Sequence, residues 1–297
     1  MNDTNSEPAV NDFELMLDSG AYSVWKQGAE LTLEGYIDFV LQYKSAWTTV
    51  VNLDVIPGKP HQIVTPAEVE RAAEVGWENY YELKRALAPH GITPIHVFHR
   101  GDDFKHLKKM LDECEYIGLA PKTDGSTEVR AAWLDTCMKY VTDDKGWPLR
   151  KLHGFGVGAL ELIQRYPWYS VDSTSWLFAS APRPGVNIGG CYVPRYGVIE
   201  FTAEGTKGSK HFDNLPSSDR NAIAQYLASK GVPNPRMLRD DYCLTCGKEF
   251  EWTYTPCCSE PKLNHALFER DGINIDYYLD IEMANQEPRP WRRDALL

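Results

Sequence analysis

Four side chains that could take part in catalysis each follow a short apolar segment: Asp18, Asp54, His99 and Asp172. Two carboxylates suit a reaction at an acetal-like carbon, where one acts as nucleophile and the other as acid and base. Taken singly, an aspartate after a strand often caps a helix or forms a turn, and a single histidine is often structural. Four such groups after successive segments favour a shared active site.

The segments before these residues are predicted to be strands of an α/β fold. The predicted strands span 13–17, 49–53, 94–98, 115–119, 152–155 and 170–171. Helical patterns separate most of them, such as 66–87, where apolar residues recur about every 3.6 positions. This alternation predicts a parallel sheet whose carboxyl ends meet at one edge. In a (β/α)8 barrel of the TIM type that edge carries the active site, and an open doubly wound sheet would also bind ligands there.

The repeating pattern changes after Trp176. Residues 189–201 are typical of a β-hairpin, and 217–229 and 266–285 of helices. We therefore expect a (β/α)8 TIM-like barrel over 12–240, irregular in its last third. A disordered leader is expected over 1–11, and a zinc-binding segment with a C-terminal helix packed on the barrel over 241–297.

A cluster of metal-binding residue types lies near the C-terminus. Its members are Cys243, Cys246, Cys257, Cys258 and His265. Thiolates separated by two residues suit tetrahedral zinc, and a histidine on a helix can complete such a site. Four protein ligands leave no open position, so the zinc would be structural. The alternative is a set of buried thiols without a metal.

The charge of the chain limits the partners that it can have. A net charge of −11 argues against binding nucleic acid through bulk electrostatics but leaves room for a local basic groove. The basic residues of the C-terminal half form either a solvated surface or a phosphate-contacting face; they are Arg183, Arg195, Lys207, Lys210, Arg220, Lys230, Arg236, Arg239, Arg289, Arg292 and Arg293.

Two further features bear on the location of the protein. No apolar run approaches the roughly 20 residues of a membrane helix, and the first residues do not resemble a signal peptide. We therefore expect no membrane association and a cytoplasmic location, in the host cytoplasm if a phage encodes the chain.

Several motifs resemble those of the tRNA-guanine transglycosylase superfamily, the queuine and archaeosine transglycosylases, and occur in the same order. DSGAYS resembles the family's DSGGFQ, FHRG its VQGG, and YIGLA its GGLA. HGFGVGALELI followed by YSVDSTSW resembles LMGVG-x-P-x-x-L with G-x-D-x-F-D, and LNHALFERDG resembles the helix that supplies the zinc histidine. These motifs lie at 18–23, 98–101, 116–120, 153–163, 169–176 and 263–272.

The resemblance implies a pentosyltransferase reaction that exchanges one base for another. Asp172 would be the nucleophile that attacks C1′ of a nucleoside, and Asp18 the general acid and base. Asp54 would bind the amidine edge of a guanine-like base, because a carboxylate accepts two N–H donors at once. His99 and the backbone N–H of Gly118 would contact its exocyclic group.

Tyr22 could stack on the base in the same site. The target base would have to leave its stack to reach such a pocket.

The departures from the family's motifs indicate the substrate. STSWLFASAP follows the nucleophile instead of the family's proline-threonine-arginine stretch, and His99 replaces a glutamine. Asp241 stands where the family has its first zinc cysteine. This divergence resembles the phage-type (DpdA-type) DNA-guanine transglycosylases, so DNA is favoured over tRNA, with a 7-deazaguanine such as preQ0 as incoming base. The resemblance leaves open whether a partner protein must first open a duplex.

Three alternatives stay open: the same chemistry on tRNA, a barrel glycoside hydrolase acting on free saccharides, and an inactive binding protein that keeps the fold and the zinc.

Overall fold

The computed structural model describes residues 15–58, 63–122, 125–180, 189–201, 209–243, 245–248, 258, 266–285 and 287–292. The chain forms two compact units. The first unit comprises Met1–Asp172 and Arg289–Leu297, and the second comprises Ser173–Pro288. This boundary differs from the expected one between 240 and 241 and lies close to Trp176, where the repeating pattern changes. The expected leader, 1–11, lies outside the described residues.

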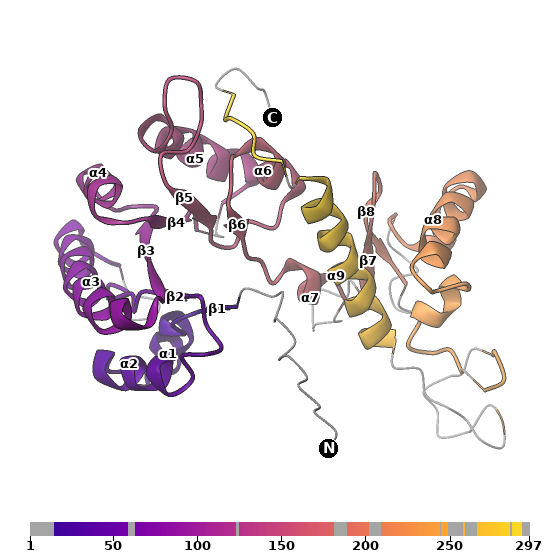
Figure 1. Ribbon diagram of the computed structural model, residues 1–297. Helices are drawn as coiled ribbons and strands as arrows, with labels where there is room; N and C mark the ends of the chain where they lie inside the picture. Colours follow the sequence, from indigo (N-terminus) through magenta and orange to yellow (C-terminus); the bar gives the residue numbers. More distant parts are fainter. Residues whose placement is uncertain are drawn as a thin grey trace, which may run out of the picture. The chain divides into compact units, whose positions relative to one another are not determined.

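The first unit contains a parallel sheet of six strands, which lie side by side in the order of the sequence. They are β1 (Met16–Leu17), β2 (Thr49–Val51), β3 (Thr93–His99), β4 (Tyr116–Ala120), β5 (Lys151–Gly154) and β6 (Ser170–Val171). Figure 1 shows this sheet curling like part of a barrel wall, with helices on its outer side. Because every neighbouring pair is parallel, all the carboxyl ends lie at one edge.

The helices of this unit connect successive strands. They are α1 (Ala21–Gln27), α2 (Leu33–Gln42), α3 (Pro66–Leu87), α4 (Phe104–Glu113), α5 (Thr127–Val141) and α6 (Leu160–Arg165), with a 3₁₀ turn, η1, at Ala88–His90. Helix α3 shows why they form where they do. Thr65 and Glu68 make a reciprocal capping box, and Pro66 occupies the first turn, where its missing N–H costs nothing. Its apolar face, including Trp77, Tyr80 and Leu83, is buried.

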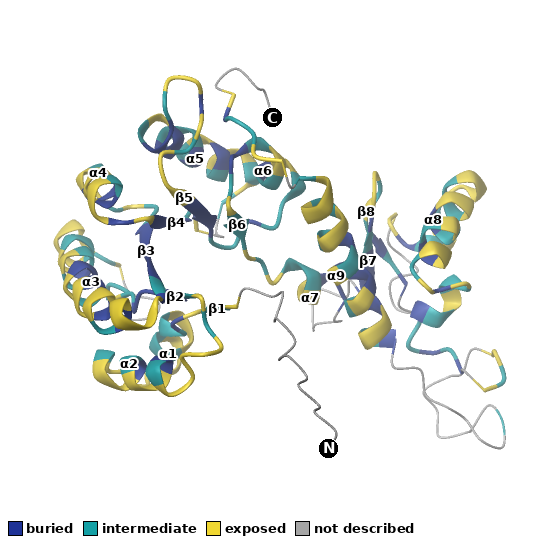
Figure 2. Ribbon diagram, viewed as in Figure 1, coloured by how far each residue is buried: buried dark blue, intermediate teal, exposed yellow. Residues whose placement is uncertain are grey.

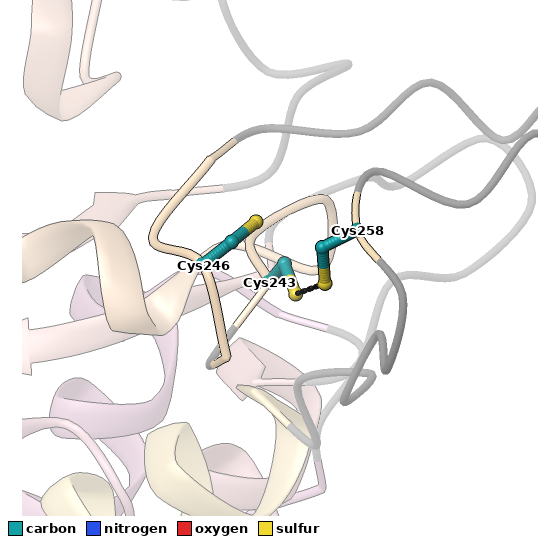
Figure 3. A group of neighbouring side chains, drawn as sticks. All are labelled: Cys243, Cys246 and Cys258. Carbon is teal, nitrogen blue, oxygen red and sulfur yellow. Dashed lines mark hydrogen bonds between the residues drawn. The ribbon is translucent and has the colours of Figure 1, made fainter.

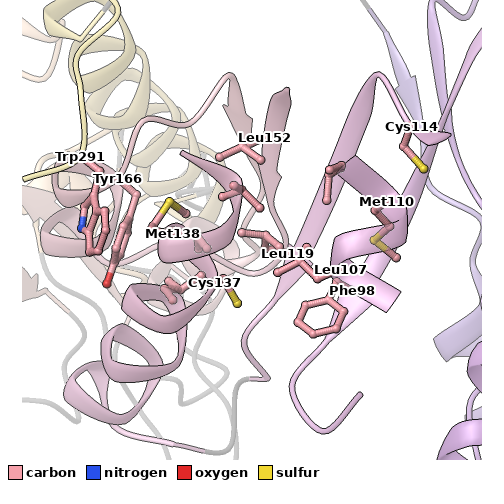
Figure 4. Close-up of a cluster of buried hydrophobic side chains, with 14 of the residues drawn as sticks. Phe98, Leu107, Met110, Cys114, Leu119, Cys137, Met138, Leu152, Tyr166 and Trp291 are labelled. Atoms are coloured by element: carbon pink, nitrogen blue, oxygen red, sulfur yellow. The ribbon is translucent and has the colours of Figure 1, made fainter. Parts of the chain in front are cut away.

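The main core of the first unit lies between the sheet and helices α3, α4 and α5. Figure 4 shows its members, among them Phe98, Leu107, Leu119 and Met138, and all four are fully buried. Figure 2 shows the same pattern, with buried strands and exposed outer helix faces. The C-terminal segment completes this core, because Trp291 is buried within it. Each such large apolar side chain contributes roughly 1.5–3 kcal/mol.

The second unit is built around an antiparallel strand pair and a long helix. Its elements are α7 (Ser175–Ser180), β7 (Gly190–Val193), β8 (Gly197–Glu200), η3 (Phe212–Asn214), α8 (Ser217–Ser229), η4 (Pro235–Leu238) and α9 (Ala266–Ala284). Its core joins Cys191, Ile199, Ile223 and Leu238 with Ile273 of α9. The predicted hairpin and the two predicted helices are therefore confirmed.

The sheet differs from the expected barrel in its last strands. The α/β class, the parallel sheet and the strand order are confirmed. Within the described part of the chain, however, the parallel sheet ends at β6, and β7 and β8 pair with each other instead. Only Pro194, Arg195 and Tyr196 separate these two strands, and so short a connection allows antiparallel pairing, whereas parallel neighbours need a crossover of about a dozen or more residues. Within the same residues, no helix combines the length and the apolarity needed to cross a membrane.

Candidate active site and cysteine cluster

The expected catalytic residues lie at the carboxyl edge of the sheet. Asp18 directly follows β1, Asp54 lies three residues beyond β2, His99 is the last residue of β3, and Asp172 directly follows β6. All these strands belong to one curled parallel sheet, and the charges of Asp54 and Asp172 both act on Asp18. The tertiary structure thus brings to one edge residues that span more than 150 positions of the sequence. The common edge predicted from the sequence is therefore observed.

The carboxyl group of Asp18 interacts electrostatically with the carboxylates of Asp172 and Asp54. Crowding by the surrounding protein desolvates it and raises its pKa, although the residue keeps an exposed face. Hydrogen bonds from the backbone N–H groups of Gly20 and Ser19 act in the opposite direction. The negative charges of Asp172 and Asp54 raise the pKa further. The result is a carboxyl group that holds a proton more readily than an ordinary aspartate.

His99 lies between two carboxylates. Its Nε2 is 3.3 Å from Oδ2 of Asp54, and its Nδ1 is 3.6 Å from Oδ2 of Asp102. Burial of part of the ring lowers its pKa, but the charges of Asp54 and Asp102 and their hydrogen bonds outweigh it and raise the pKa to about 10. The ring is thus an imidazolium near neutral pH. Both of its nitrogens face carboxylates in this structure, so its direct effect is to hold Asp54 in place.

Asp102 was not singled out from the sequence, although it directly follows the FHRG motif at 98–101. Its Oδ2 also accepts the backbone N–H of His99 at 2.8 Å, which ties the loop back onto the end of β3. An aspartate three residues after a histidine at a strand end is the only sequence signal for this role.

Asp172 is held through one of its two carboxylate oxygens. Oδ1 accepts the backbone N–H of Gly156 at 2.9 Å and lies 3.2 Å from Nε2 of His153. The side chain of Asp172 is 54% exposed, whereas that of His153 is 3% exposed. An accessible carboxylate held by N–H donors, one of them the buried ring of His153, has the arrangement expected of a nucleophile. The HGFGVG segment signalled this loop, but no property of the sequence singled out His153.

Gly118 lies in the middle of β4 and is buried. A side chain there is excluded, because an added Cβ would be 2.4 Å from the ring of Phe155. Because Gly118 has no side chain, the ring of Phe155 has space there, and this ring packs edge-on against His153.

Tyr22, on α1, is 63% exposed, and the centroid of its ring lies 5.9 Å from that of Trp25. Its ring is accessible for stacking.

A pocket of about 480 Å³ opens beside Asp54. Apolar side chains of α1, of the loop before α2 and of the segment after β2 line most of it, including Trp25, Leu31 and Ile56. Its volume falls within the range of small-molecule sites, which are commonly apolar with a few polar groups. The carboxylate of Asp54 is such a polar group.

Three of the expected zinc ligands lie together in the second unit. Figure 3 shows the side chains of Cys243, Cys246 and Cys258 as neighbours. Their sulfur atoms lie within 4.8 Å of one another. The sulfur atoms of Cys243 and Cys258 are 3.9 Å apart. Two thiolates on one tetrahedral zinc, at about 2.3 Å each, would be roughly 3.8 Å apart. The cluster therefore fits zinc, whereas Cys257 and His265 lie outside the described residues.

Backbone hydrogen bonds join Cys243 to the residues that follow Cys246. Cys243 donates its backbone N–H to the carbonyl of Lys248 and accepts the N–H of Gly247, each at 2.9 Å. Gly247 has a positive φ of 70°, which few other residues adopt. Asp241, in the position of the family's first cysteine, makes a bidentate ion pair with Arg239 at 2.8 Å. Its carboxylate is therefore already engaged.

Several of the basic residues also have partners within their own unit. Lys230 pairs with Asp280, Arg239 with Asp241, and Arg289 donates to the carbonyl of Ile163. Arg183, Lys207 and Arg293 lie outside the described residues.

No protein-family model and no curated protein matches this sequence.

Proposed function

We propose that the protein is a guanine transglycosylase that replaces guanine in nucleic acid, preferably DNA, with a 7-deazaguanine such as preQ0. The observation that carries this proposal is the unequal pair of carboxylates at one sheet edge. Asp18 has a raised pKa, and Asp172 is an accessible carboxylate held by N–H donors. Two carboxyl groups with different environments are what acid–base and nucleophilic roles require. We also propose that the six-stranded sheet is the first part of a (β/α)8-type fold.

The proposed reaction proceeds in two steps. An oxygen of Asp172 attacks C1′ as the bond from C1′ to guanine N9 breaks, and the proton of Asp18 passes to the departing guanine. The ionised Asp18 then takes the ring N–H proton of the incoming base, whose nitrogen attacks C1′ and releases Asp172. One glycosidic bond breaks and one forms, so no oxidant or further reactant is needed.

The other residues of the site would bind the base. Asp54, held by His99, offers its carboxylate to the N–H edge of a guanine-like ring, and Tyr22 offers an exposed ring for stacking. The pocket beside Asp54 would receive a ring of this size. His99 would act by holding Asp54, because both of its ring nitrogens face carboxylates. The backbone N–H of Gly118 stays a proposed contact of the exocyclic group. Zinc would be structural, bound by three cysteines and His265.

Nucleoside mass spectrometry tests the proposal. Purified protein is incubated with preQ0 and, separately, with duplex DNA, single-stranded DNA and unmodified tRNA. Asp172→Asn removes the nucleophile with little change of shape, and Asp112→Asn, an exposed aspartate of α4, is the matched control. We expect the deazaguanine nucleoside in DNA with the wild type and Asp112→Asn, and none with Asp172→Asn.

The alternatives predict other products. Incorporation only into tRNA would keep the chemistry and replace DNA by tRNA as substrate. Release of sugar from a saccharide without any incoming base would replace the transglycosylase by a glycoside hydrolase, which the carboxylate pair also suits. A folded wild type that neither incorporates a base nor forms a covalent adduct at Asp172 would contradict the proposal.

A further inference from the structure

A continuous series of hydrogen-bonding side chains leads from Tyr116 on β4 to Asp172. The hydroxyl of Tyr116 lies 2.5 Å from Oγ of Ser170, which lies 2.6 Å from Nδ1 of His153. Nε2 of His153 then lies 3.2 Å from Oδ1 of Asp172. Tyr116 and His153 are 3% and 2% exposed, whereas Ser170 is partly buried and Asp172 is exposed.

The chemistry of these groups sets the direction in which they donate. An ionised carboxylate can only accept hydrogen bonds, so Nε2 of His153 must carry the proton that faces Asp172. In a neutral imidazole Nδ1 is then an acceptor, and the hydroxyl of Ser170 must donate to it. The remaining lone pairs of Ser170 accept from the hydroxyl of Tyr116. Each donor is thus used once, and all of them point toward Asp172.

The same contacts distinguish the two oxygens of Asp172. Oδ1 accepts from both His153 and the backbone of Gly156. Among the described residues, Oδ2 has no hydrogen-bond partner. Gly156 is itself held, because Nη2 of Arg130 donates to its carbonyl oxygen at 2.5 Å. The carboxylate is therefore fixed through one oxygen, and the other is free to react.

We propose that His153 is a positioning residue that fixes Oδ1 of Asp172 and leaves Oδ2 as the attacking oxygen, with its tautomer set by Ser170 and Tyr116. The role of Oδ2 as the attacking oxygen rests on the proposed function. The hydrogen bonds from His153 and Gly156 to Oδ1 do not depend on it. In the reaction, the N–H donors hold the carboxylate in line with C1′ and stabilise its negative charge when the glycosyl ester breaks.

The first test reads the tautomer directly and needs no activity. Nitrogen-15 NMR of histidine-labelled protein distinguishes the protonated from the unprotonated ring nitrogen, and the resonances of His153 are assigned by their loss in His153→Gln. We expect Nε2–H with an unprotonated Nδ1 in the wild type. Ser170→Ala should reduce that preference, and Asp172→Asn should shift Nε2. A wild-type ring protonated at Nδ1 alone, or one insensitive to Asp172→Asn, would overturn the proposal.

The second test uses base-exchange kinetics. His153→Phe keeps a ring but removes the donor, and His153→Gln keeps an N–H donor. Since His153→Phe removes a hydrogen bond to the charged carboxylate of Asp172, we expect kcat to fall roughly 10- to 100-fold with little change in KM. Partial recovery is expected in His153→Gln. His90→Gln, an exposed histidine of η1, should match the wild type.

The outcomes of the two tests separate the two proposals. A folded His153→Phe with wild-type kcat would overturn the positioning role while leaving the transglycosylase in place. If the wild type exchanges no base, the proposed function fails, and the NMR measurement still decides whether His153 holds Asp172. Should His153→Phe fail to fold, Ser170→Ala and Tyr116→Phe provide the same comparison, each with an expected fall in kcat of a few fold.

Discussion

Gly156 donates its backbone N–H to Oδ1 of Asp172 from a conformation that is strained for other residues. Its φ is +63°, and the N–H to oxygen contact is 2.9 Å. Asp172 comes from the end of β6, and Gly156 follows β5, so parallel pairing of these strands brings the two together. The contact couples the backbone conformation of one loop to the position of the proposed nucleophile.

Gly156→Ala should therefore weaken both folding and catalysis. A Cβ in the left-handed region costs roughly 1–2 kcal/mol, and relief of that strain would move the N–H away from Asp172. We expect a lower urea midpoint and a reduced kcat. Gly91→Ala is the control, because Gly91 has a φ of 69° in an exposed turn outside the site. Gly91→Ala should lower the stability of the protein without changing kcat. Equal effects of both variants on kcat would contradict this role of Gly156.

The pKa of Asp18 should depend on Asp172. Because the negative charge of Asp172 contributes to raising that pKa, Asp172→Asn should lower it. Asp54→Asn should have the same effect. Carboxyl carbon-13 NMR titration of Asp18 in the folded proteins measures the change. Asp112→Asn serves as the control and should leave the titration midpoint of Asp18 unchanged. An unchanged midpoint in Asp172→Asn would show that the two carboxylates do not interact.

The ion pairs of His99 should give a pH-dependent stability. Its pKa in the folded protein is about 10, above the ordinary value of 6.5. A raised histidine pKa stabilises the folded state fully below pH 6.5, and this contribution is lost as the pH rises toward 10. The difference in urea stability between wild type and His99→Gln should therefore be largest at pH 6 and shrink by pH 10. A difference that stays constant over this interval, or one that His90→Gln reproduces, would contradict the pairing.

The cysteine cluster predicts one bound zinc ion. Cys243→Ser and Cys246→Ser should reduce the metal content measured by mass spectrometry and lower the melting temperature, because a structural metal contributes directly to folding. Cys114→Ala, in the core of the first unit, should lower stability but retain the metal. Separate Cys257→Ser and His265→Ala variants identify the remaining ligand. Full metal content in Cys243→Ser would rule out the site as assigned.

The stability of the second unit should depend on Arg270, whose side chain is fully buried. Arg270 is 0% exposed, pairs with Asp240 at 3.0 Å and donates to the carbonyls of Ser180 and Leu238. Removing one member of a buried ion pair costs about 3–5 kcal/mol, so Arg270→Ala should lower the free energy of unfolding by this order. Arg236→Ala, an exposed arginine of η4, should change it little. Equal urea midpoints for the two variants would contradict the role of Arg270.

The sequence alone was sufficient to place the candidate residues after parallel strands. Local patterns carry this information, because apolar runs that alternate with helical periodicity specify strands and helices. The edge shared by Asp18, Asp54, His99 and Asp172 follows from parallel pairing. The same local patterns also predicted the hairpin of β7 and β8, whose strands are close in the sequence. They did not specify that, in the described part of the chain, the parallel sheet ends at β6, because pairing of that sheet depends on segments that are distant in the sequence.

The partners of the candidate residues required the tertiary structure. Tyr116, His153 and Ser170 lie on three different strands, and the register of β5 with β6 places His153 directly beside Ser170. A shift of that register by one residue would turn His153 to the other face of the sheet and break the series that ends at Asp172. Hydrogen bonds between side chains far apart in sequence depend on such registers, so composition and spacing identified Asp172 but not the residues that hold it.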